Sequence, residues 1–528
     1  MRSWLGLVER LAGNRLARRA ADAVFSHYAR WRVGRLDHNP AGAQQEKTMI
    51  RLIRQAADTA FGRDHGFTAI RTVADYQRQV PLRDYAAFWS DYWQPAFPHL
   101  TNATWPGQTP YLALSSGTTT GSTKYIPVSA AMLASNRRAA LTGLSWFYAA
   151  HPDPALFSGR MFFLGGSTDL TRPDPAFPHT FAGDLSGIAT REVPSILRSY
   201  TFPPLDLALL TDWENKLDRL AEQSAHLPVT LVSGVPSWLL VLFERLRQLT
   251  GRERIAEVWP TLRLVVHGGT RFDPYRALFR WLVGEDVHFL ETYPASEAFI
   301  AAEDPRHGLL RLIPDHGVFF EFVPVAELGQ DRPTRHTVAD VVPGVQYAVV
   351  LTTCAGLWSY LLGDTICFER RDPPLLRFTG RTRQFLSAFG EHLIGEEVER
   401  AVTQAAEFTG THVTDFHVGP VFPRTSGMPG RHRYLVEFAR VPRDGNAFAR
   451  ELDAALSSIN EDYRAHRAGD LTMLAPEVVS VPRGSFAGWM HSRGKLGGQH
   501  KVPRMDNTGR LTEELTDWFQ ESLIGGKP

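Results

Sequence analysis

LALSSGTTTGSTKYIPVS, residues 112–129, is the most informative stretch of this 528-residue chain. A short apolar run at 111–114 is followed at 115–123 only by Ser, Thr and Gly, and Lys124 closes this stretch before a second apolar pair. Glycines let the backbone curl until its N–H groups converge, and the hydroxyls add donors around the same concavity. Such a concavity suits phosphate oxygens, and Lys124 supplies a mobile cation that a triphosphate or pyrophosphate would need.

We predict that this loop binds phosphate, although clusters of Ser, Thr and Gly are often plain connecting loops. A flexible linker is not normally held between two strand-like runs, and it has no need of a single lysine at its end. The loop is not a Walker A motif, because no Gly-Lys-Ser/Thr follows a glycine at the required spacing. The residues predicted to surround the phosphates are Ser115, Ser116, Gly117, Thr118, Thr119 and Lys124.

Composition limits the class of protein. A chain of 528 residues exceeds one ordinary core, so two or more domains are expected. The formal net charge of +1, with 21% charged residues, does not indicate nucleic acid or an anionic membrane as a partner. The two cysteines, Cys354 and Cys367, indicate a reducing compartment and no disulfide framework. Without an apolar run of membrane-spanning length or an uninterrupted signal-peptide core, we expect a cytoplasmic protein with no stable membrane insertion.

Short apolar segments alternate with helical patterns after the loop. Helices are expected at 130–150, 213–225, 237–249 and 275–282, and buried strands at 160–166, 229–236, 262–269, 287–293, 316–324 and 346–353. This alternation indicates an α/β sandwich with largely parallel sheets. Ligands of such sheets collect at the carboxyl ends of the strands.

A glycine-rich turn follows the strand expected at 262–269. Gly268, Gly269 and Thr270 would let a flat ring lie against bare backbone. Gly-Gly after a strand is also an ordinary turn, so this signal is weak by itself.

A second turn, ETYPASE at 291–297, combines an aromatic ring, a small hydroxyl and a carboxylate. Tyr293 could stack on an adenine, Ser296 could contact a phosphate, and Glu297 could hold Mg²⁺. A hard cation that bridges phosphates requires only one or two carboxylate oxygens from the protein.

Two further polar residues end apolar runs. Asp364 follows a glycine at the end of GLWSYLLGD and could accept hydrogen bonds from a ribose diol, although a turn-capping aspartate is the plain alternative. Arg381, in FTGR, could reach a ribose or a phosphate.

Taken together, these motifs resemble a known family in their order and spacing. SSGTTTGSTKYIP, ETYPASE, FFEFVP, GLWSYLLGD, FTGR and the near-terminal GGQHKVPR are similar to the auxin-responsive acyl-acid amido synthetase family in its bacterial form. This family belongs to the adenylate-forming superfamily of firefly luciferase. Many members have Tyr-Arg before the Gly-Asp turn, whereas Leu361 follows Tyr360 here, so a phosphate or substrate contact made by that arginine elsewhere in the family is not carried over to this chain.

The chain becomes more polar beyond about residue 383. Helical spacing at 396–408 and 447–463 and a half-exposed strand at 434–438 predict a small α+β domain. With the resemblance, this implies a large multi-layer α/β domain at 1–382 and a small mobile domain at 383–528. Lys495 and Lys501 are both candidates for a cation that swings into the active site, and the resemblance implies Lys501.

The resemblance implies an ATP-dependent ligase that uses Mg²⁺ and joins a small carboxylic acid to an amino acid or amine through an acyl-adenylate. Catalytic roles are then expected for Lys124, Glu297 and Lys501, and nucleoside contacts for Tyr293, Asp364 and Arg381. A second hypothesis changes the acceptor to coenzyme A or a carrier-protein thiol. A third, of another class, is a non-catalytic nucleotide- or acyl-binding protein.

Overall fold

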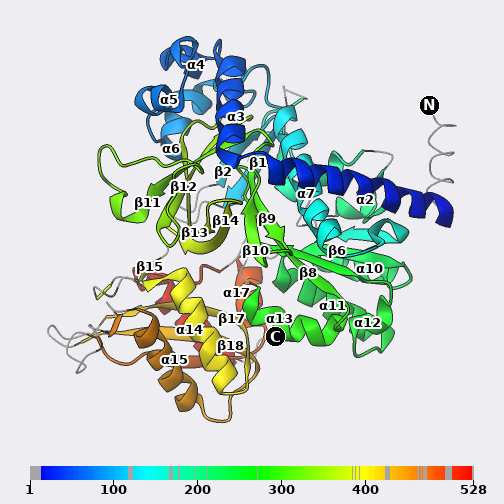
Figure 1. Ribbon diagram of the computed structural model, residues 1–528. Coiled ribbons are helices and arrows are strands. Elements are labelled where there is room, and N and C mark those ends of the chain that lie inside the picture. The colour runs from blue at the N-terminus through cyan, green and yellow to red at the C-terminus, as the bar shows by residue number, and fades with distance from the viewer. Residues whose placement is uncertain are drawn as a thin grey trace. The chain divides into compact units, whose positions relative to one another are not determined.

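The computed structural model describes residues 14–525 except 117–122, 166–169, 176–178, 195–196, 211, 270–271, 383–384, 387, 390, 392, 423–428, 461–462, 465–466, 468–472 and 494–501 (Figure 1). The chain divides into two compact units. The large unit comprises residues 1–272, 278–362 and 366–377, and the small unit comprises 273–277, 363–365 and 378–528.

Most of an 11-stranded sheet belongs to the large unit. Its strands, in spatial order, are β11 (Val318–Pro324), β12 (Gln346–Thr353), β13 (Tyr360–Arg370), β14 (Leu375–Arg381), β10 (Leu309–Leu312), β9 (Phe299–Asp304), β8 (His288–Pro294), β7 (Leu264–Gly268), β6 (Val229–Gly234), β3 (Arg160–Phe163) and β5 (Thr201–Phe202). Strands β5, β3, β6, β7 and β8 run parallel, as the alternation of strands and helices predicts.

The other part of this sheet corrects the expectation of largely parallel strands. The pairs β8 with β9, β9 with β10, β10 with β14, and β11 with β12 are antiparallel. For β8 with β9 and for β9 with β10 the physical reason is connection length, because parallel neighbours need a crossover of a dozen or more residues. Only residues 295–298 separate β8 from β9, so β9 must return alongside β8 in the opposite direction.

The predicted phosphate loop connects two strands of a second, three-stranded sheet. Strands β1 (Tyr111–Ser116) and β2 (Thr123–Val128) pair antiparallel, with Ser115 opposite Lys124, and β4 (Phe181–Gly183) pairs parallel with β1. The two apolar runs that flank the loop are therefore the two arms of the hairpin.

Helices cover the sheets of the large unit. In Figure 1 the long helix α2 (Arg15–His38) lies against α7 (Ala130–Ala150), which begins where Ser129 accepts a hydrogen bond from the Met132 N–H and which also packs on β9. The remaining α-helices are α3 (Ala41–Ala56), α4 (Ala60–Asp64), α5 (Val73–Gln79), α6 (Tyr85–Phe88), α8 (Leu185–Arg191), α9 (Leu205–Ala208), α10 (Trp213–Ser224), α11 (Pro236–Thr250), α12 (Ile255–Val258) and α13 (Asp273–Val283).

Short turns of other helix types complete this unit: a π-helical turn, η2 (Trp89–Trp93), and the 3₁₀ turns η1 (Phe67–Ala69), η3 (Gln94–Ala96), η4 (Leu156–Ser158) and η6 (Val325–Glu327). Among the residues that the structure describes, no helix is both long and apolar enough to cross a bilayer.

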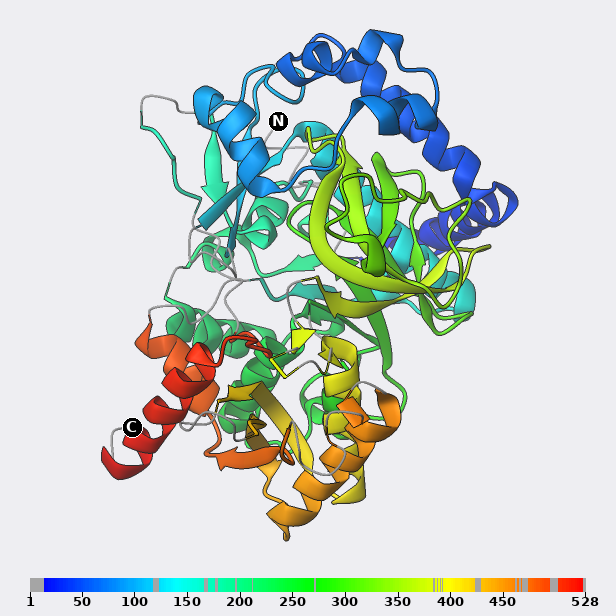
Figure 2. The same ribbon diagram turned by 90° about the vertical axis from the view of Figure 1, so that its left-hand side faces the viewer.

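The small unit is an α+β fold, as predicted, built on the sheet β17–β18–β19 (Figure 2). Tyr434 and Val436 on β18 face a core shared with α14 and α15, whereas the intervening Leu435 contacts a core shared with α17 and α18. Both faces of the sheet are therefore covered. The bounds are β15 (Phe385–Leu386), β16 (Leu393–Ile394), α14 (Gly395–Phe408), β17 (His412–Val421), β18 (Arg431–Arg440), α15 (Gly445–Ile459), β19 (Glu477–Val481), α17 (Ser485–Ser492) and α18 (Arg510–Gly525).

Candidate active site

The turn between β8 and β9 carries three of the predicted site residues. Tyr293 ends the regular pairing of β8, and the turn closes where the Ala295 N–H donates to the Ala298 carbonyl at 2.8 Å. Tyr293, Ser296 and Glu297 are each only 8% exposed. A buried carboxylate requires hydrogen-bond donors or a cation, because the charged form is costly to desolvate. Glu297 is therefore the buried charged group of this turn, and its partners define the site.

Tyr360 supplies one of those donors. Its hydroxyl donates to Oε1 of Glu297 at 3.2 Å, across 63 residues of sequence. Burial, followed by the negative charge of Glu297, raises the pKa of Tyr360 well above its usual value. The tyrosine hydroxyl consequently stays protonated at neutral pH and acts as a donor to the carboxylate.

Backbone contacts fix the place of Tyr360. The Arg83 N–H donates to the Ser359 carbonyl at 3.0 Å, and the Leu361 N–H donates to the Arg83 carbonyl at 2.8 Å, so the two hydrogen bonds bracket Tyr360. The Tyr360 ring packs against the buried Phe88 ring, with centroids 6.1 Å apart. The segment before α6 and the start of β13 therefore form one support.

Lys124 lies beside the same segment. Its Nζ is 5.4 Å from the centroid of the Tyr85 ring, a cation–π distance, and the Tyr85 hydroxyl accepts the backbone N–H of Tyr125 at 2.9 Å. Tyr85 also contributes to the electrostatic environment of Tyr360. The structure thus brings the Lys124 arm of the hairpin and the Glu297 turn toward one group of tyrosines.

The backbone geometry at positions 268 and 269 accounts for glycine at both. A Cβ at Gly268 would lie 2.4 Å from the carbonyl oxygen of Thr292 on the neighbouring strand β8. Gly269 has φ +76°, in the left-handed region that glycine adopts readily. The closeness of strand β8 accounts for glycine at position 268. That a ring binds against this turn therefore stays a prediction.

Asp364 and Arg381 form an ion pair within the small unit. Asp364 Oδ1 lies 3.3 Å from Arg381 Nε, and their side chains are 10% and 45% exposed. Gly363, with φ +89°, turns the backbone just before the aspartate. An ion pair with one well-exposed partner contributes about 1 kcal/mol or less, so the Asp364 carboxylate could accept hydrogen bonds from a ribose diol at small cost to this pair.

Several predicted residues lie outside the described part of the chain. These are Gly117, Thr118, Thr119, Thr270, Lys495 and Lys501, together with the side chain of Ser116. Ser115, whose side chain is described, is half-buried on β1.

The hydrogen bond between Tyr360 and Glu297 was not predicted from the sequence. Tyr360 stands in an apolar run, and nothing in its neighbourhood signals a hydrogen bond to a distant turn. The one available signal was chemical: a buried tyrosine hydroxyl needs a partner.

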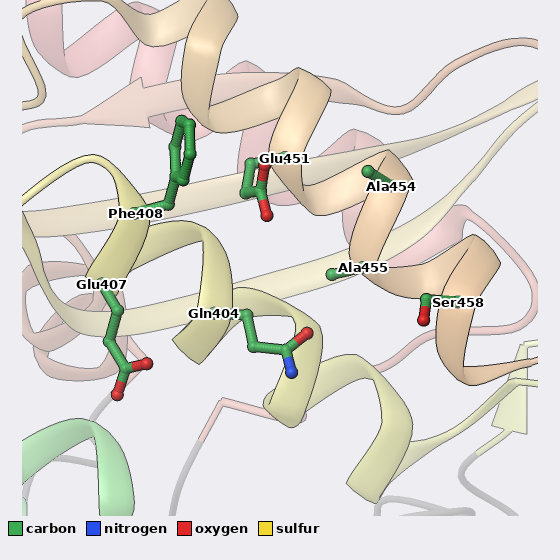
Figure 3. Close-up of a pocket in the computed structure, with 7 residues that line it drawn as sticks. All are labelled: Gln404, Glu407, Phe408, Glu451, Ala454, Ala455 and Ser458. Atoms are coloured by element: carbon green, nitrogen blue, oxygen red, sulfur yellow. The ribbon is translucent and has the colours of Figure 1, made fainter.

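A groove in the small unit holds none of the predicted residues (Figure 3). It runs between α14 and α15 and is lined by Gln404, Glu407, Phe408, Glu451, Ala454, Ala455 and Ser458. Phe408 is 70% exposed beside it.

Three segments of the chain match domains of one family in order. Residues 35–174 match the GH3 family N-terminal domain, 311–381 the GH3 family central domain, and 396–510 the GH3 family C-terminal domain. The chain belongs to the GH3 family. Lys124 lies in the N-terminal match of this GH3 chain, and Tyr360, Asp364 and Arg381 in the central one, whereas Glu297 falls between matched segments.

Known GH3 proteins resemble this one in part of their length. Indole-3-acetic acid-amido synthetase GH3.3 of Arabidopsis thaliana is 26% identical over 267 residues, which cover 47% of this chain and 44% of that relative. The chain therefore spans less than half the length of this curated relative.

Solved structures share the fold over nearly the whole chain. GH3.15 acyl acid amido synthetase superposes with a TM-score of 0.75 at 17% identity, covering 92% of this chain and 94% of the other. A 2-hydroxyisobutyryl-CoA ligase superposes with a TM-score of 0.60 at 13% identity, covering 93% and 94%. These likenesses confirm the predicted fold class, a large α/β domain followed by a smaller domain.

Proposed function

We propose that this GH3 protein is an ATP-dependent acyl-acid amido synthetase. The observation that carries the proposal is the match to all three GH3 domains, in order, along one chain. The name of the Arabidopsis relative, an amido synthetase for indole-3-acetic acid, supports an amide product. The substrates would be ATP, a small carboxylic acid, and an amino acid or amine.

The reaction has two steps. A carboxylate oxygen attacks the α-phosphorus of ATP, the bond from that phosphorus to the bridging oxygen breaks, and pyrophosphate leaves. The amine nitrogen then attacks the acyl carbon of the adenylate, the bond to the AMP oxygen breaks, and the nitrogen loses a proton. The first step depends chiefly on alignment and charge neutralisation, so it needs little acid–base machinery.

Residues of this chain have distinct tasks in that scheme. Lys124 and the loop that it follows neutralise phosphate charge, and Asp364 with Arg381 holds the ribose. Lys501 is proposed to enter with the small domain, pivoting near residues 381–385, and to stabilise charge at the reacting phosphate.

A magnesium ion fits the residues around Glu297. The described residues contain no cluster of three or more His, Cys, Asp or Glu side chains that could hold a metal. One buried carboxylate, Glu297, is what a Mg²⁺ ion needs when nucleotide phosphates and waters supply its other ligands. When bound, the ion would neutralise negative charge on the phosphates.

Carboxylate-dependent exchange of pyrophosphate into ATP tests the first step. We expect exchange with some members of a broad acid panel, and a fall of about a hundredfold or more in Glu297→Gln. Glu303→Gln is the matched control, because the Glu303 carboxylate lies on β9 outside the turn and accepts the Glu291 N–H. No exchange with any acid would argue for a non-catalytic binding protein.

Thioester formation is the second candidate, since the fold is shared with a CoA ligase. Mass spectrometry of products formed with a mixture of amino acids or with coenzyme A separates the two. An acyl-amino acid product supports the amido synthetase, and an acyl-CoA product replaces it.

A further inference from the structure

A buried polar network surrounds Ser359, the residue before Tyr360. Ser359 has φ +46°, a left-handed conformation that costs a non-glycine residue roughly 1 to 2 kcal/mol. Its backbone N–H donates to Thr352 Oγ1 at 3.0 Å, and its hydroxyl lies 3.0 Å from the hydroxyl of Tyr76. Ser359, Thr352 and Tyr76 are all fully buried. Because the strain is retained at a buried position, the surroundings must impose it.

A buried ion pair fixes the other side of the network. Arg335 Nη2 donates to Ser359 Oγ at 2.5 Å and to Glu321 Oε2 at 2.8 Å, while Arg335 Nε donates to Glu321 Oε1 at 3.0 Å. Arg335 also donates to the backbone carbonyls of Gln77 and Val80. The planar guanidinium therefore joins α5, β11 and the turn before β13 in one rigid arrangement.

The left-handed turn at Ser359 sets the direction in which Tyr360 leaves the backbone. A change of φ at residue 359 would swing the Tyr360 ring and carry its hydroxyl away from Glu297. The network itself lies among core residues of the large unit, and Tyr360 is the member of this segment whose hydroxyl contacts Glu297.

We propose that Tyr360 is a positioning residue that aims the Glu297 carboxylate at the metal–nucleotide complex, and that the Glu321–Arg335 pair holds Tyr360 in place through Ser359. The inference rests on the proposed function, because it assumes that Glu297 holds Mg²⁺ on ATP. Partners that orient a metal-binding carboxylate typically change metal affinity tenfold to a hundredfold when removed. Tyr360 thus contributes without touching substrate.

The test measures metal binding directly. Mn²⁺ is titrated by electron paramagnetic resonance into protein saturated with α,β-methylene-ATP, which cannot form the adenylate. We expect Tyr360→Phe to weaken Mn²⁺ binding about tenfold or more while affinity for the metal-free analogue changes less than threefold. Tyr347→Phe is the matched control, since that buried hydroxyl accepts the Val342 N–H instead, and should leave Mn²⁺ binding within threefold of wild type.

A second pair of variants isolates the role of the backbone. Ser359→Gly and Ser359→Ala both lose the hydroxyl, but only glycine adopts positive φ without strain. We expect Ser359→Gly to bind Mn²⁺ at least threefold more tightly than Ser359→Ala. Equal affinity in the two variants would overturn the link from the network to Tyr360.

The outcomes separate the inference from the function. If Glu297→Gln loses Mn²⁺ binding and Tyr360→Phe binds as wild type, the positioning role is overturned and the proposed function stands. If the wild-type protein binds neither the analogue nor Mn²⁺ with it, the proposed function fails and the role assigned to Tyr360 fails with it.

Discussion

Replacing Glu321 by glutamine should destabilise the large unit strongly. The two carboxylate oxygens accept from four donors: Arg335 Nε, Arg335 Nη2, Gln77 Nε2 at 3.0 Å and Ser359 Oγ at 3.3 Å. Glutamine keeps one acceptor oxygen, and its NH₂ group would face two of these donors. The substitution therefore removes two hydrogen bonds and leaves the guanidinium of Arg335 buried without its countercharge.

The size of the effect follows from those losses. Hydrogen bonds to a charged group contribute about 1.5 to 3 kcal/mol each, and breaking a buried ion pair costs about 3 to 5 kcal/mol, so we expect about 4 kcal/mol. The large unit has roughly 370 residues, which at about 2.1 cal/mol/K per residue gives an unfolding entropy near 0.8 kcal/mol/K. The corresponding fall in Tm is about 5 °C.

Differential scanning calorimetry of the whole chain measures this shift. Asp218→Asn is the control, because Asp218 pairs with Arg245 at 3.3 Å while their side chains are 52% and 39% exposed. Exposed pairs contribute little, so the control Tm should stay within about 1 °C of wild type. If Glu321→Gln also melts within 1 °C of wild type, the network does not hold this region as argued.

Two further predictions concern stability. Burial lowers the pKa of His316 to about 4, so the ring is neutral when folded but takes up a proton on unfolding below its ordinary pKa of about 6.5. The contribution of His316 to the free energy of unfolding is therefore intact above about pH 6.5 and falls by about 2 kcal/mol at pH 5. The variant His316→Gln should reduce the loss of Tm between pH 7 and 5 by about 2 °C. An unchanged pH dependence of Tm would contradict this. Gly268→Ala should lower Tm by about 1 to 4 °C, because the new Cβ would meet the Thr292 carbonyl at 2.4 Å. Gly34→Ala, in open space on α2, should raise Tm slightly, and similar melting of both variants in a thermal-shift assay would refute the packing argument.

Local patterns predicted many elements closely. The helix expected at 130–150 is α7 with the same bounds, and the strand expected at 346–353 is β12. Both depend on side-chain periodicity and end signals within a few residues, such as Ser129 at the helix start. Strand direction was predicted less well. Whether two neighbouring strands run parallel or antiparallel depends on whether the chain between them crosses over the sheet or turns back.

The candidate site, too, was predicted from the sequence only in part. Motif order along the chain was enough to predict the family and the fold, since glycines, hydroxyls and carboxylates at strand ends are recorded directly in the sequence. The sequence does not show which partner each polar group contacts. Glu297 and Tyr360 are 63 residues apart, and the network that supports Tyr360 draws Tyr76, Glu321 and Arg335 from separate segments. These contacts form only when the strands assemble, because a polar group that becomes buried needs a hydrogen-bond donor or acceptor nearby.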